Sequence, residues 1–166
     1  TYEGNADFSG STYKGEADFS GSTYEKDVTF STPIFRSTYV GKADFRGSTY
    51  QGWAYFTDST YKSWANFNDS TYENETDFSG SIFYQETYFG KDGYSSFSRF
   101  TNYAPHFYDK TNNRNTLFGS HNNDFTVDTN EGYPIVLNSE GLPIGCNFLT
   151  SEQKEYLKDK FQEIEE

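Results

Sequence analysis

The sequence predicts an all-β fold: a right-handed parallel β-helix, or β-solenoid, with an irregular C-terminal cap and one short C-terminal α-helix. The first observation behind this prediction is an 11-residue repeat that runs through residues 1–100. The second is composition, because 17 Phe, 15 Tyr and 2 Trp in 166 residues can form a core despite a net charge of −12. The third is the regular spacing of these aromatic residues within the repeat, which places them on one side of the chain.

The repeat reads TYEGNADFSGS at 1–11 and TYKGEADFSGS at 12–22, and it resumes after the interruption TPIFR at 32–36. Eleven-residue periods also occur in right-handed helical supercoils. Gly, Ser, Thr and Asp fill these units, however, and they disfavour helix. Short strands separated by corners fit the composition better.

Alternation within one unit predicts which side chains face inward. In an extended segment, residues two apart share a face, so Ala17 and Phe19 point one way while Asp18 points the other. Gly21 then allows a corner. The aromatic residues are therefore expected inside, and the Asp residues, Asp58 among them, are expected outside in solvent.

Units such as ADFSG, STYKG, ADFRG and ANFND resemble the pentapeptide-repeat family, whose units wind a right-handed, four-sided β-helix. The sequence differs by one extra residue in every second unit, which gives the period of 5 + 6 residues. This implies coils of about 22 residues, with 33 residues per coil as the alternative. The extra residues are Asn5, Glu16, Asp27, Lys42, Trp53, Trp64 and Glu75.

The interruption at 32–36 is expected to add one face to the solenoid. Tyr columns and Phe columns would then exchange places above it, and Asp18 would lie below Thr38 rather than below another carboxylate. Such an exchange would be favourable, because like charges stacked at strand spacing repel one another.

Three segments of one structural unit are predicted: the solenoid at 1–100, an irregular cap at 101–150 with a strand at 133–139, and a helix at 151–166. Thr150 and Gln153 predict a capping box at the start of the helix. The helix carries an apolar stripe, which either packs on the last coil as a lid or forms a dimer contact. The stripe consists of Leu157, Phe161 and Ile164.

Composition and motifs argue against several classes of function. The acidic charge argues against nucleic-acid binding, and no apolar run approaches the ~18 residues of a membrane span. Phosphate-binding and catalytic motifs are absent, so no enzyme activity, cofactor or metal is expected. Cys146, His106 and His121 lie in the irregular tail, and a buried structural cysteine is the favoured interpretation. Asp124 and Asp128 only partly match a calcium loop and are expected in ordinary turns.

Two candidate surfaces follow from the repeat. Trp53, Tyr55 and Trp64 replace polar residues at outward positions, where they either form an interaction surface or fold back over the chain's own corners. In coils of 22 residues the two tryptophans lie on opposite sides. The first coil would expose its strand edge and its rings, which predicts a site of assembly. These rings are Tyr2, Phe8, Tyr13 and Phe19.

The function expected from these features is structural or adhesive: a non-enzymatic module that assembles head-to-tail with copies of itself or continues upstream repeats of a longer surface protein. Glycans or other cell-surface components are further candidate partners, and an extracellular location is expected. The family resemblance implies an alternative. Some of its members are acidic, dimerise through a C-terminal element and mimic DNA to inhibit a gyrase-type topoisomerase.

Overall fold

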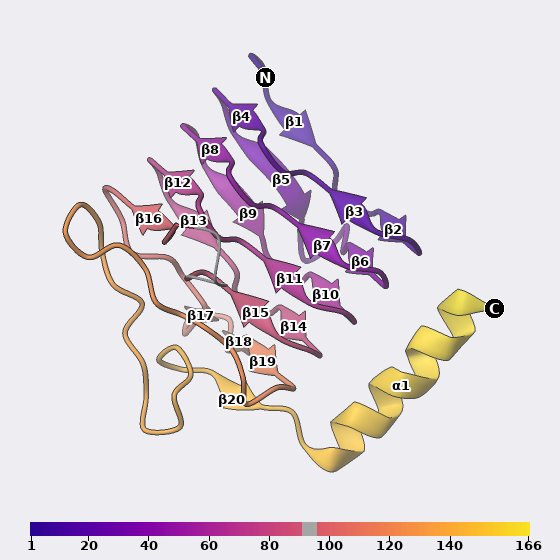
Figure 1. Ribbon diagram of the computed structural model, residues 1–166. Helices are drawn as coiled ribbons and strands as arrows, with labels where there is room; N and C mark the ends of the chain where they lie inside the picture. Colours follow the sequence, from indigo (N-terminus) through magenta and orange to yellow (C-terminus); the bar gives the residue numbers. More distant parts are fainter. Residues whose placement is uncertain (91–95) are drawn as a thin grey trace.

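In the computed structural model, the chain forms a parallel β-solenoid of about four turns followed by a C-terminal helix of 15 residues (Figure 1). The predicted fold class is confirmed. The structure describes residues 1–90 and 96–166, so residues 91–95 of the predicted repeat region lie outside the described residues. Within these two ranges, no helix combines the length and the hydrophobicity that crossing a bilayer requires.

Each turn adds one short strand to each of four parallel sheets, called faces 1 to 4 in the order in which the chain visits them. Face 1 consists of β1 (Ala6–Asp7), β5 (Val28–Ser31), β9 (Ala54–Phe56) and β13 (Thr76–Asp77). Face 2 consists of β2 (Thr12–Tyr13), β6 (Thr38–Tyr39), β10 (Thr60–Tyr61), β14 (Ile82–Phe83), β19 (Leu117–Phe118) and β20 (Asn147–Phe148). Face 3 consists of β3 (Ala17–Asp18), β7 (Ala43–Asp44), β11 (Ala65–Asn66) and β15 (Thr87–Tyr88). Face 4 consists of β4 (Thr23–Tyr24), β8 (Thr49–Tyr50), β12 (Thr71–Tyr72) and β16 (Arg99–Phe100).

The regular coil contains 22 residues, the shorter of the two predicted lengths. Ser48 donates its backbone N–H to the Oγ of Ser70, 22 residues further on, at 3.3 Å. The corresponding bond from Ser11 to Ser37 spans 26 residues, because this coil includes the interruption at 32–36.

The core consists of four columns of stacked rings, one behind each face. Rings in successive coils are nearly parallel, with Tyr50 and Tyr72 4.7 Å apart and Phe45 and Phe67 5.0 Å apart between centroids. The Phe columns of faces 1 and 3 also interdigitate, because Phe56 meets Phe45 and Phe67 edge-on at 5.2 and 5.3 Å. The columns are Phe8, Phe30, Phe56, Phe78 and Phe107 on face 1; Tyr13, Tyr39, Tyr61, Phe83 and Phe118 on face 2; Phe19, Phe45, Phe67, Phe89 and Phe125 on face 3; and Tyr2, Tyr24, Tyr50, Tyr72 and Phe100 on face 4.

The predicted exchange of columns at 32–36 is wrong. The interruption forms an external loop in which Ile34 is 84% and Phe35 61% exposed, and the columns continue unchanged past it. Asp18 therefore lies beside Asp44 and not below Thr38. Corner hydrogen bonds give the physical reason. Ser37, Ser48 and Ser70, each two residues before an inward tyrosine, bond a carbonyl of the previous coil, as Ser48 Oγ does with Phe19 O at 3.1 Å. The alanines at the equivalent position before Phe19, Phe45 and Phe67 could not form such a bond.

The C-terminal helix α1 (Ser151–Glu165) does not form a lid on the last coil. It runs back along the outside of face 2 (Figure 1), where Leu157 and Phe161 pack against the outward side chains Ile82 and Leu117. An ion pair between Lys62 and Glu165 holds its far end. The predicted capping box is confirmed, because Gln153 N–H donates to Thr150 Oγ1 at 3.1 Å and Thr150 N–H donates to Gln153 Oε1 at 2.8 Å.

Irregular chain covers the last ring of each column instead. Val127, Ile135, Leu142 and Cys146 are buried in one cluster with the rings of the final coils. Residues 108–115 add a small antiparallel pair, β17 (Tyr108–Asp109) with β18 (Arg114–Asn115). The strand predicted at 133–139 is absent from this described region, where pairing is limited to an isolated bridge between Leu137 and Pro143.

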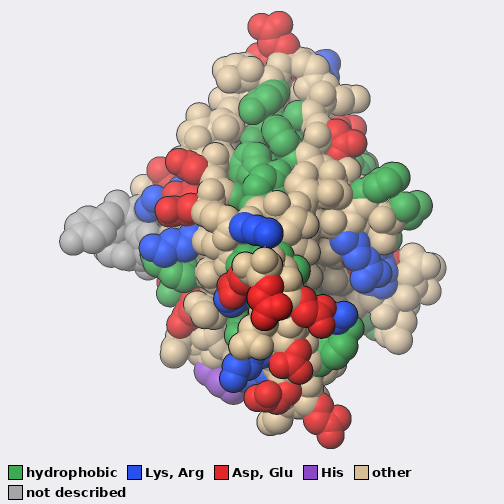
Figure 2. Space-filling view, turned by 90° about the vertical axis from the view of Figure 1, so that its right-hand side faces the viewer, with side chains coloured by type: hydrophobic (Ala, Val, Ile, Leu, Met, Phe, Trp, Pro, Cys, Tyr) green, Lys and Arg blue, Asp and Glu red, His purple; other side chains and the backbone are tan. Residues whose placement is uncertain are grey.

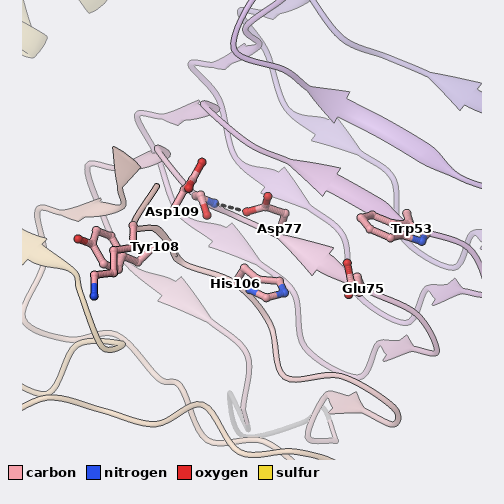
Figure 3. Close-up of a pocket in the computed structure, with 8 residues that line it drawn as sticks. Trp53, Glu75, Asp77, His106, Tyr108 and Asp109 are labelled. Atoms are coloured by element: carbon pink, nitrogen blue, oxygen red, sulfur yellow. Dashed lines mark hydrogen bonds between the residues drawn. The ribbon is translucent and has the colours of Figure 1, made fainter. Parts of the chain in front are cut away.

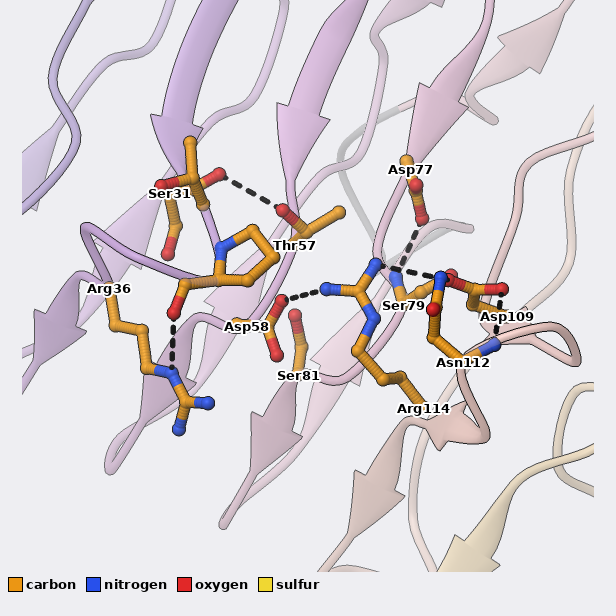
Figure 4. A network of polar contacts seen from close by, with 12 residues as sticks. Ser31, Arg36, Thr57, Asp58, Asp77, Ser79, Ser81, Asp109, Asn112 and Arg114 are labelled. Carbon is orange, nitrogen blue, oxygen red and sulfur yellow. Dashed lines mark hydrogen bonds and ion pairs between the residues drawn. The ribbon is translucent and has the colours of Figure 1, made fainter.

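A polar network ties this irregular region to the solenoid (Figure 4). Arg114 donates to Asp58 Oδ2 at 2.5 Å and to Asp109 Oδ2 at 3.3 Å. The expectation that Asp58 is solvated is wrong, because it is only 7% exposed. Burial raises the pKa of the Asp58 carboxyl above its ordinary value, although the charge of Arg114 opposes this shift. Asp58 also has a φ of 56°, at a corner position where Gly47 and Gly80 stand elsewhere.

Truncating an inward ring should destabilise the solenoid strongly, whereas truncating a loop ring should not. Phe67→Ala removes a fully buried ring and should cost about 3–5 kcal/mol of unfolding free energy. Phe35→Ala, in the external loop, should stay within about 0.5 kcal/mol. Denaturant unfolding followed by far-UV circular dichroism measures both. Equal losses for the two variants would contradict the assignment of inside and outside.

Removing Arg114 should leave the buried Asp58 carboxylate without its main counter-charge. Arg114→Met should cost about 3 kcal/mol at pH 7, and a further Asp58→Asn change should recover much of that loss. Because the folded pKa of Asp58 is raised, ionising it costs stability as the pH rises, so the Arg114→Met penalty should shrink on acidification.

Arg99→Met is the matched control, because its partners Asp128 and Glu131 are more exposed than Asp58. It should cost less than about 1 kcal/mol. Equal and pH-independent losses for the Arg114 and Arg99 variants would show that the Asp58 pair is not buried in solution.

Candidate functional site

The outward side of face 1 carries two adjacent columns of side chains. The position just before each strand is occupied by Asn5, Asp27, Trp53 and Glu75 in successive coils. The outward position within each strand is occupied by Asp7, Thr29, Tyr55 and Asp77, and His106 lies beside Asp77 through an isolated bridge. Register alone therefore brings two aromatic rings next to several carboxylates.

Trp53 and Tyr55 form an aromatic pair at the edge of a cleft. Their ring centroids are 5.6 Å apart, and the ring planes differ by 30°. Trp53 is 39% exposed, so one part of its indole faces solvent. The Trp53 cleft has a volume of about 240 Å³, and Figure 3 shows how its walls come from face 1 and from the chain after His106. It is lined by Trp53, Glu75, Asp77, Ser79, His106, Tyr108, Asp109 and Lys110.

Carboxylates dominate the electrostatics of this part of face 1. Asp27 Oδ1 accepts the backbone N–H of Trp53 at 2.9 Å, and Asp77 Oδ1 accepts that of Ser79 at 2.8 Å. The pKa of the Tyr55 hydroxyl is raised by burial and further by the negative charges of Asp27, Glu75 and Asp77. A further negative charge beside Tyr55 would therefore be unfavourable, whereas a positively charged group there would be favoured.

Trp64 lies elsewhere, on the opposite face 3. It precedes β11 as Trp53 precedes β9, and its ring is 40% exposed. The ammonium of Lys42 lies 4.6 Å from the centroid of the Trp64 ring, and Tyr88 meets that ring edge-on at 6.3 Å. As the 22-residue coil predicts, the two tryptophans lie on opposite sides of the solenoid, so the three aromatic residues form two separate sites.

The candidate assembly edge lies at the N-terminal end of the solenoid. Phe8 and Phe19 meet at 5.1 Å, and Tyr2 and Tyr13 flank them at 5.8 Å each. All four rings are less buried than those of the next coil. The C-terminal stripe differs, because Leu157 and Phe161 are buried within the chain and Ile164 is half-buried. The stripe is therefore already covered by face 2.

The residues weighed as a nucleophilic set are not brought together. Cys146 is buried and its Sγ donates to Phe107 O at 3.6 Å, while His106 is exposed on face 1 and His121 packs on Phe148 at 4.1 Å. Burial raises the pKa of the Cys146 thiol to about 12. A protonated thiol is a poor nucleophile, which favours a structural role.

The partial calcium motif consists of ordinary turns, as the sequence predicts. Asp124 Oδ1 accepts the N–H of Thr126 at 2.9 Å, and Asp128 Oδ1 accepts the N–H of Asn130 at 2.9 Å. In residues 1–90 and 96–166, no three His, Cys, Asp or Glu side chains are grouped so as to hold a metal ion.

Sequence reasoning missed most of the lining of the Trp53 cleft. Glu75 and Asp77 could have been predicted, because a 22-residue coil places them directly beside Trp53 and Tyr55. His106, Tyr108 and Lys110 follow the end of the repeat, where no periodicity predicts which face the chain rejoins.

Comparison of the chain with protein-family models, with curated proteins and with solved structures finds no match.

Cys146 should be unreactive in the folded protein. With a pKa raised to about 12, the thiol should stay protonated and resist alkylation at pH 8, then react fully once the chain is unfolded. Iodoacetamide labelling followed by mass spectrometry, with and without denaturant, measures this. Rapid labelling of the folded chain would contradict the buried position of the thiol and reopen the question of a nucleophilic role.

Proposed function

We propose that the chain is a non-enzymatic structural and adhesive module of the pentapeptide-repeat type, which assembles head-to-tail with copies of itself at an extracellular surface. Kinship with that family is supported by the four-sided coil, with one inward aromatic residue per side and a small residue two positions before it. The coil length of 22 residues would make it a variant of the family. The assembly rests on the two ends of the solenoid, and the adhesive role rests on its exposed aromatic residues.

The change in exposure along the ring columns is the observation that carries the assembly proposal. Tyr2 is 41% exposed, whereas Tyr24, the next ring of its column, is 1% exposed. Figure 2 shows hydrophobic side chains gathered in a strip above α1, on the half of the molecule that holds the N-terminal coils. An additional layer of side chains on this end would bury the first rings as the second coil buries its own.

Backbone groups at the same end are available for further pairing. Ser11 O and Tyr13 O accept from Thr38 N–H and Val40 N–H of the second coil. Because successive residues of a strand direct their backbone groups to opposite sides, the N–H and C=O of Thr12 point away from the solenoid. A strand edge of this kind recruits another strand.

The opposite end offers a different apolar surface. Val136, Leu137 and Ile144 are 62%, 45% and 54% exposed on the cap, next to Ile135 and Leu142, which are buried over the last coil. Exposed apolar patches of this kind are typical of contact surfaces. Two different ends in contact make a head-to-tail joint, which extends as an open fibre rather than closing as a dimer.

Upstream repeats of a longer polypeptide would complete the first coil through the same groups. Copies of the chain and upstream repeats would both add strands to the edge of the first coil. Only association between separate chains depends on protein concentration. The DNA-mimic alternative gains no support from the outward columns, because Thr29 and Tyr55 interrupt one and Asn66 and Tyr88 interrupt the other.

Blocking the strand edge should abolish assembly without harming the fold. Thr12→Pro removes an N–H that points away from the solenoid, and proline is tolerated at the edge of a sheet. The unmodified chain should show a mass that rises with concentration in sedimentation and light scattering, and Thr12→Pro should remain monomeric. Thr12→Ala, which keeps the N–H, is the matched control and should assemble normally.

A chain blocked at the other end makes the test specific for head-to-tail contact. Ile144→Lys should also remain monomeric alone, because a charge then lies in the apolar patch. A mixture of the Thr12→Pro and Ile144→Lys chains retains one intact joint and should form dimers and nothing larger. An unmodified chain that stays monomeric at its highest soluble concentration would refute self-assembly.

A further inference from the structure

The two tryptophans occupy equivalent positions, but the residue one coil before each carries the opposite charge. Trp64 precedes β11 on face 3, and the residue at the same position one coil earlier is Lys42, since Ala43 pairs with Ala65. The Lys42 ammonium lies 4.6 Å from the centroid of the Trp64 ring, within the range of a cation–π contact. The chain therefore supplies its own cation at Trp64.

Carboxylates stand at the corresponding positions around Trp53. Val28 pairs with Ala54 and Ala54 with Thr76, which places Asp27 one coil before Trp53 and Glu75 one coil after it. Asp27 is held beside Trp53 through the bond from the Trp53 backbone N–H at 2.9 Å. The ring that could bind a cation is thus flanked by the charges that attract one.

Further charged groups around the cleft leave it acidic. Asp77 adds a third carboxylate beside Tyr55, whose pKa is raised first by burial and then by the charges of Asp27, Glu75 and Asp77. Asp109 is engaged by Asn112 and Arg114. His106 and Lys110 are the basic groups of the lining, and both are exposed.

We propose that the Trp53 cleft binds an organic cation, namely an ammonium, quaternary ammonium or guanidinium head group. The exposed indole of Trp53 supplies a cation–π contact, and Asp27, Glu75 and Asp77 supply the negative charge. The volume of about 240 Å³ lies below the range of about 300–1,000 Å³ for drug-sized ligands, which suits one head group. The head group belongs either to a small molecule or to a basic side chain of a partner polypeptide. Binding does not depend on the assembly proposed above.

Tryptophan fluorescence tests the proposal directly. Trp64→Phe leaves Trp53 as the sole indole, and the Thr12→Pro change can be added to exclude effects of assembly. Titration with choline should change the Trp53 emission saturably, and 3,3-dimethylbutan-1-ol, its uncharged analogue of the same shape, should bind at least tenfold more weakly. Equal binding of the two would overturn the proposal. So would saturable binding of cellobiose without binding of choline, which would assign the cleft to sugars.

Charge-neutralising variants identify the groups responsible. Glu75→Gln and Asp77→Asn preserve shape and should each weaken choline binding several-fold, with the largest loss when both are present. Glu86→Gln is the matched control, because Glu86 stands beside Trp64 as Glu75 stands beside Trp53. Thermal melts verify that each variant is folded. Unchanged affinity in the Glu75 and Asp77 variants would overturn the assignment.

The opposite face allows a gain of binding to be tested. In a Trp53→Phe background, Lys42→Glu removes the internal cation and places a carboxylate beside Trp64, as Asp27 lies beside Trp53. This variant should acquire choline binding that the Trp53→Phe chain lacks. Failure to acquire it, with the variant folded, would contradict the mechanism.

The source of the head group is distinguished by comparing ligands of different size. Acetyl-Gly-Arg-Gly-amide that binds at least tenfold more tightly than methylguanidinium would indicate a polypeptide partner, because groups beyond the head then contribute. Equal affinity would indicate a small molecule. The two proposals are tested independently. A variant that fails to assemble but still binds choline, or that assembles but no longer binds choline, affects only one of them.

Discussion

Ring stacking between successive coils is the constraint on which the rest of the structure depends. Strands of neighbouring coils are separated by about 4.8 Å, which matches the spacing at which offset aromatic rings attract each other. Tyr50 and Tyr72, at 4.7 Å and 1°, show how closely the two spacings agree. Each coil must therefore deliver one ring to each face in register, which the regular coil does with 22 residues and the coil that contains 32–36 does by placing its extra residues in an external loop. Ring stacking also explains how so acidic a chain, poor in aliphatic residues, forms a continuous core.

The same constraint explains why residues 32–36 loop out of the coil, a feature that the sequence predicted only in part. Periodicity predicted the short strands, the inward rings and the coil length, because these depend on repeated local pattern. It did not predict that the extra residues leave the coil, because that choice depends on contacts between coils. Keeping the serine column intact, with bonds such as Ser70 Oγ to Phe45 O at 3.0 Å, evidently outweighs exposing Ile34 and Phe35 and placing Asp18 beside Asp44.

The position of the helix and of Asp58 could not be derived for a related reason. The apolar stripe of α1 was evident, but several apolar surfaces compete for it, and only Ile82 and Leu117 reveal that face 2 turns apolar on its outside in the last coils. Asp58 occupies the same corner position as Asp69, which is exposed. Asp58 differs in that it pairs with Arg114, 56 residues away in an irregular segment. A repeat predicts the features that all coils share, but it does not predict contacts that the C-terminal cap makes with one coil only.

Function has to reside where the repeat is free to vary. The stacked core restricts inward positions to Phe, Tyr, Ser and small residues. Only the outward side chains and the two ends can therefore vary to bind a particular ligand or partner. The column that contains Asp27, Trp53 and Glu75 and the column that contains Lys42, Trp64 and Glu86 share one backbone geometry. They differ in the residue one coil before the tryptophan, which is Asp27 in the first column and Lys42 in the second. Because of this difference, the Trp64 ring contacts a lysine, whereas the Trp53 ring is flanked by carboxylates. A solenoid can thus change the chemistry of a lateral site by a single substitution one coil away, without altering the stacking that holds it together.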